Sequence, residues 1–121
     1  MILVVDDDPG IVDLLTRALS QHGYRVETAH DGADAYSHLR SSDCKCILLD
    51  MNMPRINGVE LLMLMQAEDI HIPTIVMAGF SDYEEDEMKQ FDNVTTLIQK
   101  PFELDAILKA VKQYAMPPST V

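Results

Sequence analysis

Five charged side chains in this sequence stand directly after predicted strands. Asp6, Asp7 and Asp8 follow the first strand, Asp50 follows the third, and Lys100 follows the fifth. In open α/β sheets, ligands bind beyond the carboxyl ends of the strands, at the point where the strand order reverses. If the first and third strands are neighbours, these five groups gather at one end of the sheet and form a site.

A cluster of carboxylates next to a lysine is suited to phosphoryl chemistry. Carboxylates that lie close together repel one another, and a hard divalent cation such as Mg²⁺ removes that repulsion. A carboxylate beside Mg²⁺ can attack an activated phosphoryl group and form an aspartyl phosphate. The cation and a nearby lysine then offset negative charge in the transition state. The sequence supplies a nucleophile, metal ligands and a second cation.

Each of these signals has a simpler interpretation when it is taken alone. An acidic run after a strand can be only a loop with a helix cap. Lys100-Pro101 alone would be an ordinary surface pair. The joint placement at three strand ends favours a site over coincidence.

Apolar and amphipathic segments alternate five times along the chain. The expected strands cover residues 2–5, 24–29, 46–49, 72–77 and 95–98. The expected helices run from about Pro9 to Gly23, around Ala35 and Leu39 to about Arg40, from about Val59 to Ala67, from about Tyr83 to Phe91 and over Leu104 to Val111. Such alternation with short connections predicts a doubly wound parallel sheet with helices on both faces.

The net charge of the chain limits the kinds of partner that it can bind. Nine basic residues face 20 acidic ones, which gives a formal net charge of -11 in 121 residues. Duplex affinity depends on lysine and arginine, so we expect no direct nucleic-acid binding by this domain. No apolar run approaches the roughly 20 residues that span a bilayer, and no secretion signal opens the chain. We therefore expect a cytoplasmic protein that binds no membrane.

The cysteines and histidines lack the spacing of a metal site. Cys44 and Cys46 do not form a Cys-x-x-Cys motif, and they are predicted to be buried or half-buried small side chains. The four histidines are predicted to lie on the surface or at helix ends: His22, His30, His38 and His71.

Several segments of the chain together carry a family resemblance. They are Ile2-Leu3-Val4-Val5-Asp6-Asp7-Asp8, Leu48-Leu49-Asp50-Met51-Asn52-Met53-Pro54, Asn57-Gly58, Pro73-Thr74-Ile75-Val76-Met77 and Lys100-Pro101-Phe102. In order and spacing they resemble the receiver domain of two-component response regulators, from beginning to end of the chain. The resemblance implies a flavodoxin-like (βα)5 fold whose five-stranded parallel sheet has the order 2-1-3-4-5.

The resemblance also implies a role for each residue of the predicted site. Asp50 would be the phosphoacceptor. Asp6 and Asp7 would hold Mg²⁺ together with Asp50 and the backbone carbonyl of Asn52. Lys100 would pair with the phosphoryl group, and its bond to the following proline would be cis. The chain would not be a turnover enzyme, because the phosphoryl group goes onto its own side chain and is lost there by hydrolysis.

Partners and a domain plan follow from the same resemblance. A histidine kinase or phosphotransfer protein would donate the phosphoryl group, and a shift of conformation would control an output domain or partner. Residues 1–115 would form the receiver domain and 116–121 a tail or the start of a linker, with an output domain possible beyond it. The helix 83–91 and the final helix would be the first choice for partner contacts, including those of a possible homodimer.

Two positions depart from the family pattern. Ala78 stands where the family usually carries Ser or Thr, and it has no side-chain donor for a phosphoryl oxygen. Leu97 stands where an aromatic side chain usually swings inward on activation. Three interpretations stay open: a backbone donor such as the Gly79 N–H replaces the hydroxyl, phosphorylation shifts the conformation only weakly, or the chain is a phosphorylation-independent interaction module.

Two other functional classes share part of this pattern. A phosphatase of the haloacid-dehalogenase type also uses an aspartate nucleophile, but Pro9 interrupts its usual motif and the chain is short for a cap. A flavodoxin-like cofactor carrier shares the sheet, but it needs a phosphate-binding loop where this chain has acidic residues.

The helix predicted over 59–67 is more apolar than one buried face requires. It contains five consecutive apolar residues, from Leu61 to Met65. Either Leu61 or Leu64 is an ordinary exposed apolar residue, or the run forms a protein contact surface, since methionine adapts to partners.

Overall fold

The fold alternates strands and helices, as the sequence predicts. The computed structural model describes residues 1–41, 43–53, 56–79 and 85–115. Its strands are β1 (Ile2–Val5), β2 (Val26–Ala29), β3 (Cys46–Asp50), β4 (Thr74–Gly79) and β5 (Val94–Lys100). Its helices are α1 (Pro9–Gln21), α2 (Gly32–Ser41), α3 (Gly58–Ala67), α4 (Glu85–Met88) and α5 (Leu104–Tyr114).

The five strands form one parallel sheet in the order β2-β1-β3-β4-β5. This order confirms the expected doubly wound, flavodoxin-like architecture. In the register, Val5 of β1 lies opposite Leu49 of β3. Asp6 directly follows Val5 and Asp50 directly follows Leu49, so the register brings the two aspartates side by side.

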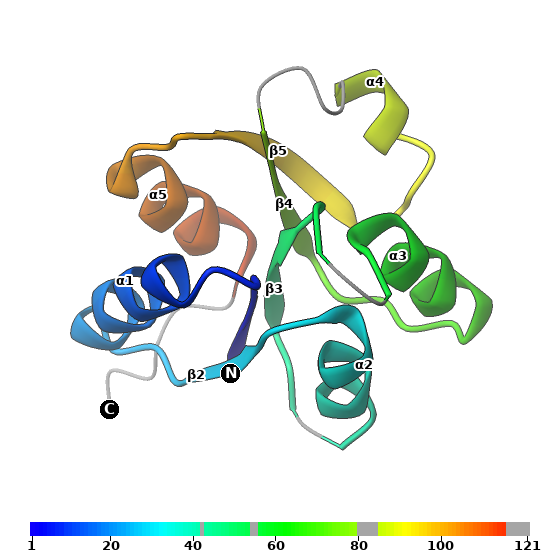
Figure 1. Ribbon diagram of the computed structural model, residues 1–121, viewed down its shortest axis with the longest axis horizontal. Helices are drawn as coiled ribbons and strands as arrows, with labels where there is room; N and C mark the ends of the chain where they lie inside the picture. The colour runs from blue at the N-terminus through cyan, green and yellow to red at the C-terminus, as the bar shows by residue number, and fades with distance from the viewer. Residues whose placement is uncertain (42, 54–55, 80–84, 116–121) are drawn as a thin grey trace.

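Helices cover both faces of the sheet (Figure 1). On one face, Val4 and Leu48 pack against α1 and α5; on the other, Leu3 and Leu49 pack against α2 and α3. Strands β1 and β3 are therefore buried on both faces, which explains why their sequences are continuous apolar runs rather than alternating ones. Among the described residues, no helix combines the length and apolar character needed to cross a membrane.

Several elements differ in their bounds from the sequence prediction. Strand β2 begins at Val26 rather than at residue 24, and β4 covers Thr74–Gly79 rather than 72–77. Strand β5 extends beyond the expected 95–98, because Gln99 and Lys100 continue the ladder opposite Ala78 and Gly79. Polar side chains at the end of an edge strand hide that extension from an apolar pattern. Helix α4 covers four residues, whereas a helix over 83–91 was expected. Tyr83 and the residue after it lie outside the described part of the chain.

The apolar run of α3 is only partly buried. Leu61 is fully buried, so the prediction that it could be the exposed residue of this run was wrong. Leu64 is half-buried, and Met63 is 57% exposed. The helix turns Leu61, Leu62 and Met65 toward the sheet, which leaves Met63 on the opposite side.

Candidate functional site

Three aspartates meet at the carboxyl ends of β1 and β3. Asp6, Asp7 and Asp50 each offer a carboxylate oxygen, and these oxygens lie within 4.8 Å of one another. Asp6 and Asp50 are 1% and 3% exposed, whereas Asp7 is exposed to solvent. The expectation that the acidic residues gather at one end of the sheet is confirmed.

Lys100 enters the same cluster from the end of β5. Its Nζ lies 2.7 Å from Asp6 Oδ2 and 3.5 Å from Asp50 Oδ1. Since β4 separates β3 from β5, this long side chain reaches across the end of a strand to pair with both carboxylates. The peptide bond between Lys100 and Pro101 is cis, as the family resemblance implied.

The electrostatics of the cluster are unbalanced. Burial raises the pKa of Asp50 from its ordinary 3.8 to about 6, and the neighbouring Asp6 adds to that rise against the Asn52 N–H and the Lys100 charge. Burial disfavours the charged form of Lys100, yet its hydrogen bond to Asp6 and the charges of both carboxylates raise its pKa overall. Three carboxylates face one ammonium group, and this excess of negative charge fits the binding of a divalent cation.

Backbone amides hold the two buried carboxylates in place. The Asp8 N–H donates to Asp6 Oδ1 at 2.9 Å, and the Asn52 N–H donates to Asp50 Oδ1 at 3.1 Å. Asp8 itself caps α1, because its Oδ1 accepts from the Gly10 N–H at 2.9 Å. The third residue of the acidic run therefore starts a helix and orients Asp6, while the first two lie in the cluster.

Two glycines make close backbone contacts with residues that follow Asp50. A Cβ on Gly58 would lie 2.7 Å from Met51 Cα and 3.1 Å from the Asp50 carbonyl oxygen. A Cβ on Gly32 would clash with the Ile56 carbonyl oxygen. Both positions need glycine for close approach, so the start of α2 lies against Ile56 and the start of α3 against Met51.

The remaining predicted site residues differ in how far they are buried. Asn52 is exposed, and the role of its carbonyl as a metal ligand stays a prediction. Ala78 is 1% exposed and belongs to the core beneath α3 and α4, so it presents a methyl group and no donor there. Leu97 is half-buried and packs against the same core.

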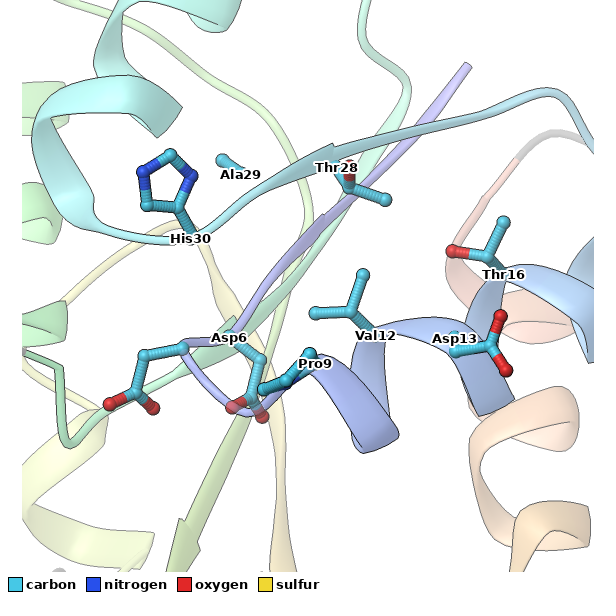
Figure 2. Close-up of a pocket in the computed structure, with 9 residues that line it drawn as sticks. Asp6, Pro9, Val12, Asp13, Thr16, Thr28, Ala29 and His30 are labelled. Carbon is cyan, nitrogen blue, oxygen red and sulfur yellow. The ribbon is translucent and has the colours of Figure 1, made fainter.

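A pocket of about 300 Å³ lies beside the acidic cluster, and the sequence did not predict it (Figure 2). It is bounded by the start of α1 and the end of β2, and its lining residues are Asp6, Asp7, Pro9, Val12, Asp13, Thr16, Thr28, Ala29 and His30. Thr16 Oγ1 is a buried atom that has no hydrogen-bond partner among the described residues. Helical spacing places Val12 and Thr16 on one side of α1, but only the tertiary fold brings β2 to face them.

Comparison with known proteins supports this picture. The family model for the response regulator receiver domain matches residues 2–112. Among solved structures, the NtrX receiver domain of Brucella abortus has a TM-score of 0.86 at 26% identity, over 94% of this chain and 97% of that one. TrrA of Thermotoga maritima, solved in complex with Mg²⁺ and BeF, has a TM-score of 0.82 at 30% identity, over 93% and 96%.

Curated relatives agree with the structural neighbours. Sporulation initiation phosphotransferase F of Bacillus subtilis is 33% identical over 93% of this chain and 91% of its own length. Response regulator MprA of Mycobacterium avium is 32% identical over 92% of this chain. The match covers 49% of MprA, so this chain spans about half the length of that relative. The matched residues 2–112 include the acidic cluster and Lys100. The chain therefore belongs to the family of response regulator receiver domains.

Proposed function

We propose that this chain is a phosphorylatable switch whose phosphoacceptor is Asp50. The observation that carries the proposal is the pairing of a buried Asp50 with a second carboxylate and with Lys100 at the carboxyl end of the sheet. A buried carboxylate whose pKa is raised to about 6 by burial and by Asp6 is an unfavourable arrangement for stability alone. Such perturbed groups are common at functional sites.

Mg²⁺ is the cofactor that this cluster would take. Asp6, Asp7 and Asp50 would supply carboxylate oxygens, and Asn52 would supply its backbone carbonyl. A bound Mg²⁺ would offset the charge of the incoming phosphoryl oxygens. The solved complex of TrrA with Mg²⁺ and BeF supports this assignment by similarity.

The chain's own groups account for the transfer step. An Asp50 carboxylate oxygen attacks phosphorus and forms a P–O bond while the P–N bond of a phosphohistidine donor breaks. The donor imidazole leaves and keeps its electron pair, taking a proton from solvent. Lys100, already 3.5 Å from Asp50, turns to a phosphoryl oxygen and stabilises the added negative charge. Water then hydrolyses the acyl phosphate, so Asp50 is consumed and regenerated and no external substrate turns over.

The partners follow from this chemistry and from the relatives. A histidine kinase or phosphotransfer protein of the cytoplasm donates the phosphoryl group.

Residues 1–115 act as the receiver domain and 116–121 as a tail or linker toward an output domain or partner. The net charge of -11 argues that this domain does not itself bind nucleic acid. A homodimer is a further assembly that this domain could form.

Intact mass spectrometry after incubation with acetyl phosphate and Mg²⁺ tests the proposal. The native chain should gain one phosphoryl group, and it should gain none with EDTA or in Asp50→Asn. Asp105→Asn removes an aspartate on the exposed side of α5 and should be phosphorylated like the native chain. A folded native chain that gains no mass, or an Asp50→Asn variant that does, would contradict the proposal.

A second candidate function is a receiver-like interaction module whose state depends weakly on phosphorylation. The buried methyl group of Ala78 favours it, because a charge-assisted hydrogen bond from a hydroxyl is worth about 1.5–3 kcal/mol of bias toward the active state. Amide NMR spectra with and without beryllofluoride and Mg²⁺ separate the two functions. Shifts confined to the acidic cluster favour the module, and shifts that spread over α4 and β5 favour the switch.

A further inference from the structure

The outward side of α3 forms an apolar hollow of about 410 Å³. Five residues line it, and we call them the α3 face: Ile56, Glu60, Met63, Leu64 and Ala67. Among the described residues, two large apolar side chains are exposed, and Met63, at 57%, is more exposed than Leu14, at 47%. None of these lining residues belongs to the acidic cluster.

The helical residues of the α3 face are not required by the core. Leu61, Leu62 and Met65 already fill the buried side of the helix. Of the α3 face, Ile56 packs against the core, whereas Met63 and Leu64 are not among the residues of that cluster. Exposed apolar side chains that gather around a hollow mark interaction sites.

The other long helices, α1 and α5, carry charged residues on their outward sides. Asp13 and Arg17 form an ion pair on α1, and α5 carries Asp105, Lys109 and Lys112. Helix α3 has a single charged residue in ten, Glu60. Its outer side therefore lacks the solvation that the charged residues give to α1 and α5.

Charge indicates what would cover this face. Glu60 is the charged residue among the lining residues, and the whole chain carries -11. A second copy would bring the same glutamate and the same excess of negative charge to the contact, which opposes association. A partner with basic groups beside an apolar stripe would match both the hollow and the glutamate.

We propose that the α3 face is a docking surface for a basic amphipathic helix of another protein. Apolar side chains of that helix would fill the hollow around Met63 and Leu64, in the manner of helix-in-groove recognition. Lysine or arginine on its flank would pair with Glu60. Docking uses groups outside the phosphorylation site, so it occurs with the unphosphorylated chain.

Titration of the full chain with a synthetic helical peptide tests this surface. The peptide has leucines along one side and lysines along the other; one control has the same residues in scrambled order, and another has glutamate in place of lysine. With labelled methionine methyl groups and backbone amides, NMR should show shifts at Met63 and over 56–67, while the buried methyl group of Met77 stays unchanged. Neither control peptide should produce these shifts.

Three variants give the quantitative test. Met63→Ser should weaken binding of the leucine–lysine peptide about tenfold, as loss of a central contact does. Glu60→Gln should weaken it about threefold, because glutamine preserves the capping box with Asn57 and removes only the charge. Leu14→Ser alters the other large exposed apolar side chain and should leave affinity unchanged.

Several outcomes would overturn the proposal. Equal binding by the native chain and Met63→Ser, equal binding of the scrambled peptide, or shifts located on α1 or α5 would each remove the α3 face from the contact. Light scattering of the chain alone provides one more check. An oligomer that dissociates in Met63→Ser would assign the surface to a second copy of this chain instead.

Discussion

Asp50 carries a carboxylate that is 3% exposed and lies beside the nearly buried carboxylate of Asp6. Its pKa of about 6 lies above the ordinary value of 3.8, mainly because burial disfavours the charged form. At pH values between 3.8 and about 6, Asp50 of the folded chain keeps a proton that the unfolded chain has lost. The resulting stabilisation is complete below pH of about 4 and is lost as pH rises through about 6.

Replacement of Asp50 by asparagine should therefore stabilise the metal-free chain in a pH-dependent way. Relative to the native chain, Asp50→Asn should gain on the order of 2 to 3 kcal/mol in free energy of unfolding at pH about 7.5, and little near pH 4. Urea titrations in EDTA at the two pH values measure this gain. Asp105→Asn provides the control for removal of one charge elsewhere, and an Asp50→Asn gain that is equal at both pH values would contradict the argument.

Lys100 is the cation that offsets the two buried carboxylates. Its side chain is 22% exposed and pairs with Asp6 at 2.7 Å. Lys100→Met leaves these carboxylates without a positive partner, so we expect a loss of about 3 kcal/mol in free energy of unfolding at neutral pH. Lys109→Met, on the exposed side of α5, should change stability by less than about 0.5 kcal/mol. Chemical denaturation of both variants in EDTA measures the difference, and similar losses in the two would be evidence against the pairing.

Among the elements, α3 joins the acidic cluster to the outer surface. Its first residue, Gly58, touches the backbone of Met51, and its cap, Asn57, exchanges hydrogen bonds with Glu60. The sequence motif Asn57-Gly58 thus has two physical functions, a helix cap and a close backbone approach. Met51, the residue after Asp50, therefore lies in direct contact with the start of α3.

Addition of a methyl group at Gly58 should disrupt this contact. Gly58→Ala places Cβ 2.7 Å from Met51 Cα, a backbone atom that cannot yield without a shift of the chain. We expect a loss of about 2 kcal/mol in free energy of unfolding and slower phosphorylation by acetyl phosphate, because Asp50 precedes Met51. Denaturant titration and intact mass measure the two effects.

Gly10→Ala is the matched control for this change. Its Cβ would meet only the Asp8 carboxylate, at 3.2 Å, and that side chain can adjust. It lies in the first turn of α1, where alanine is a better helix former than glycine, so stability should be unchanged or higher by up to about 1 kcal/mol. Equal losses at the two glycines would mean that the close approach at Met51 has no energetic role.

Element types were predictable, but several boundaries were not. The apolar run Ile2–Val5 identifies a strand buried on both faces, and its match to β1 is complete. Gln99 and Lys100 extend β5 through backbone pairing with β4, which no side-chain pattern reports. In α3, consecutive apolar residues obscure which one faces solvent, so Met63 was identified as exposed only once the helix was packed.

For the whole molecule, the sheet order decides which distant residues meet. Periodicity predicts alternating strands and helices, yet it does not state that β1 lies between β2 and β3; that order came from the family resemblance and is confirmed. Once it is known, the meeting of Asp6, Asp50 and Lys100 follows from strand ends alone. The pocket around Thr16 and Thr28 was not predictable, because it depends on the packing of α1 beside β2.

The net charge of -11 makes repulsion a property of the whole chain, in addition to the local repulsion at the site. Screening of exposed charges improves as NaCl rises from about 10 mM to about 150 mM, since the Debye length falls from roughly 30 Å to roughly 8 Å. The free energy of unfolding should therefore rise by about 1 kcal/mol in both the native chain and Asp50→Asn.

At matched ionic strength, millimolar Mg²⁺ should further increase the free energy of unfolding of the native chain, because the ion binds at the acidic cluster. That second increase should be much smaller in Asp50→Asn, which lacks one carboxylate of the cluster, and denaturant titrations of both proteins measure it. Equal effects of Mg²⁺ and NaCl at the same ionic strength would show that the cluster binds no divalent cation, whereas an increase specific to Mg²⁺ and to Asp50 separates the site from the general charge.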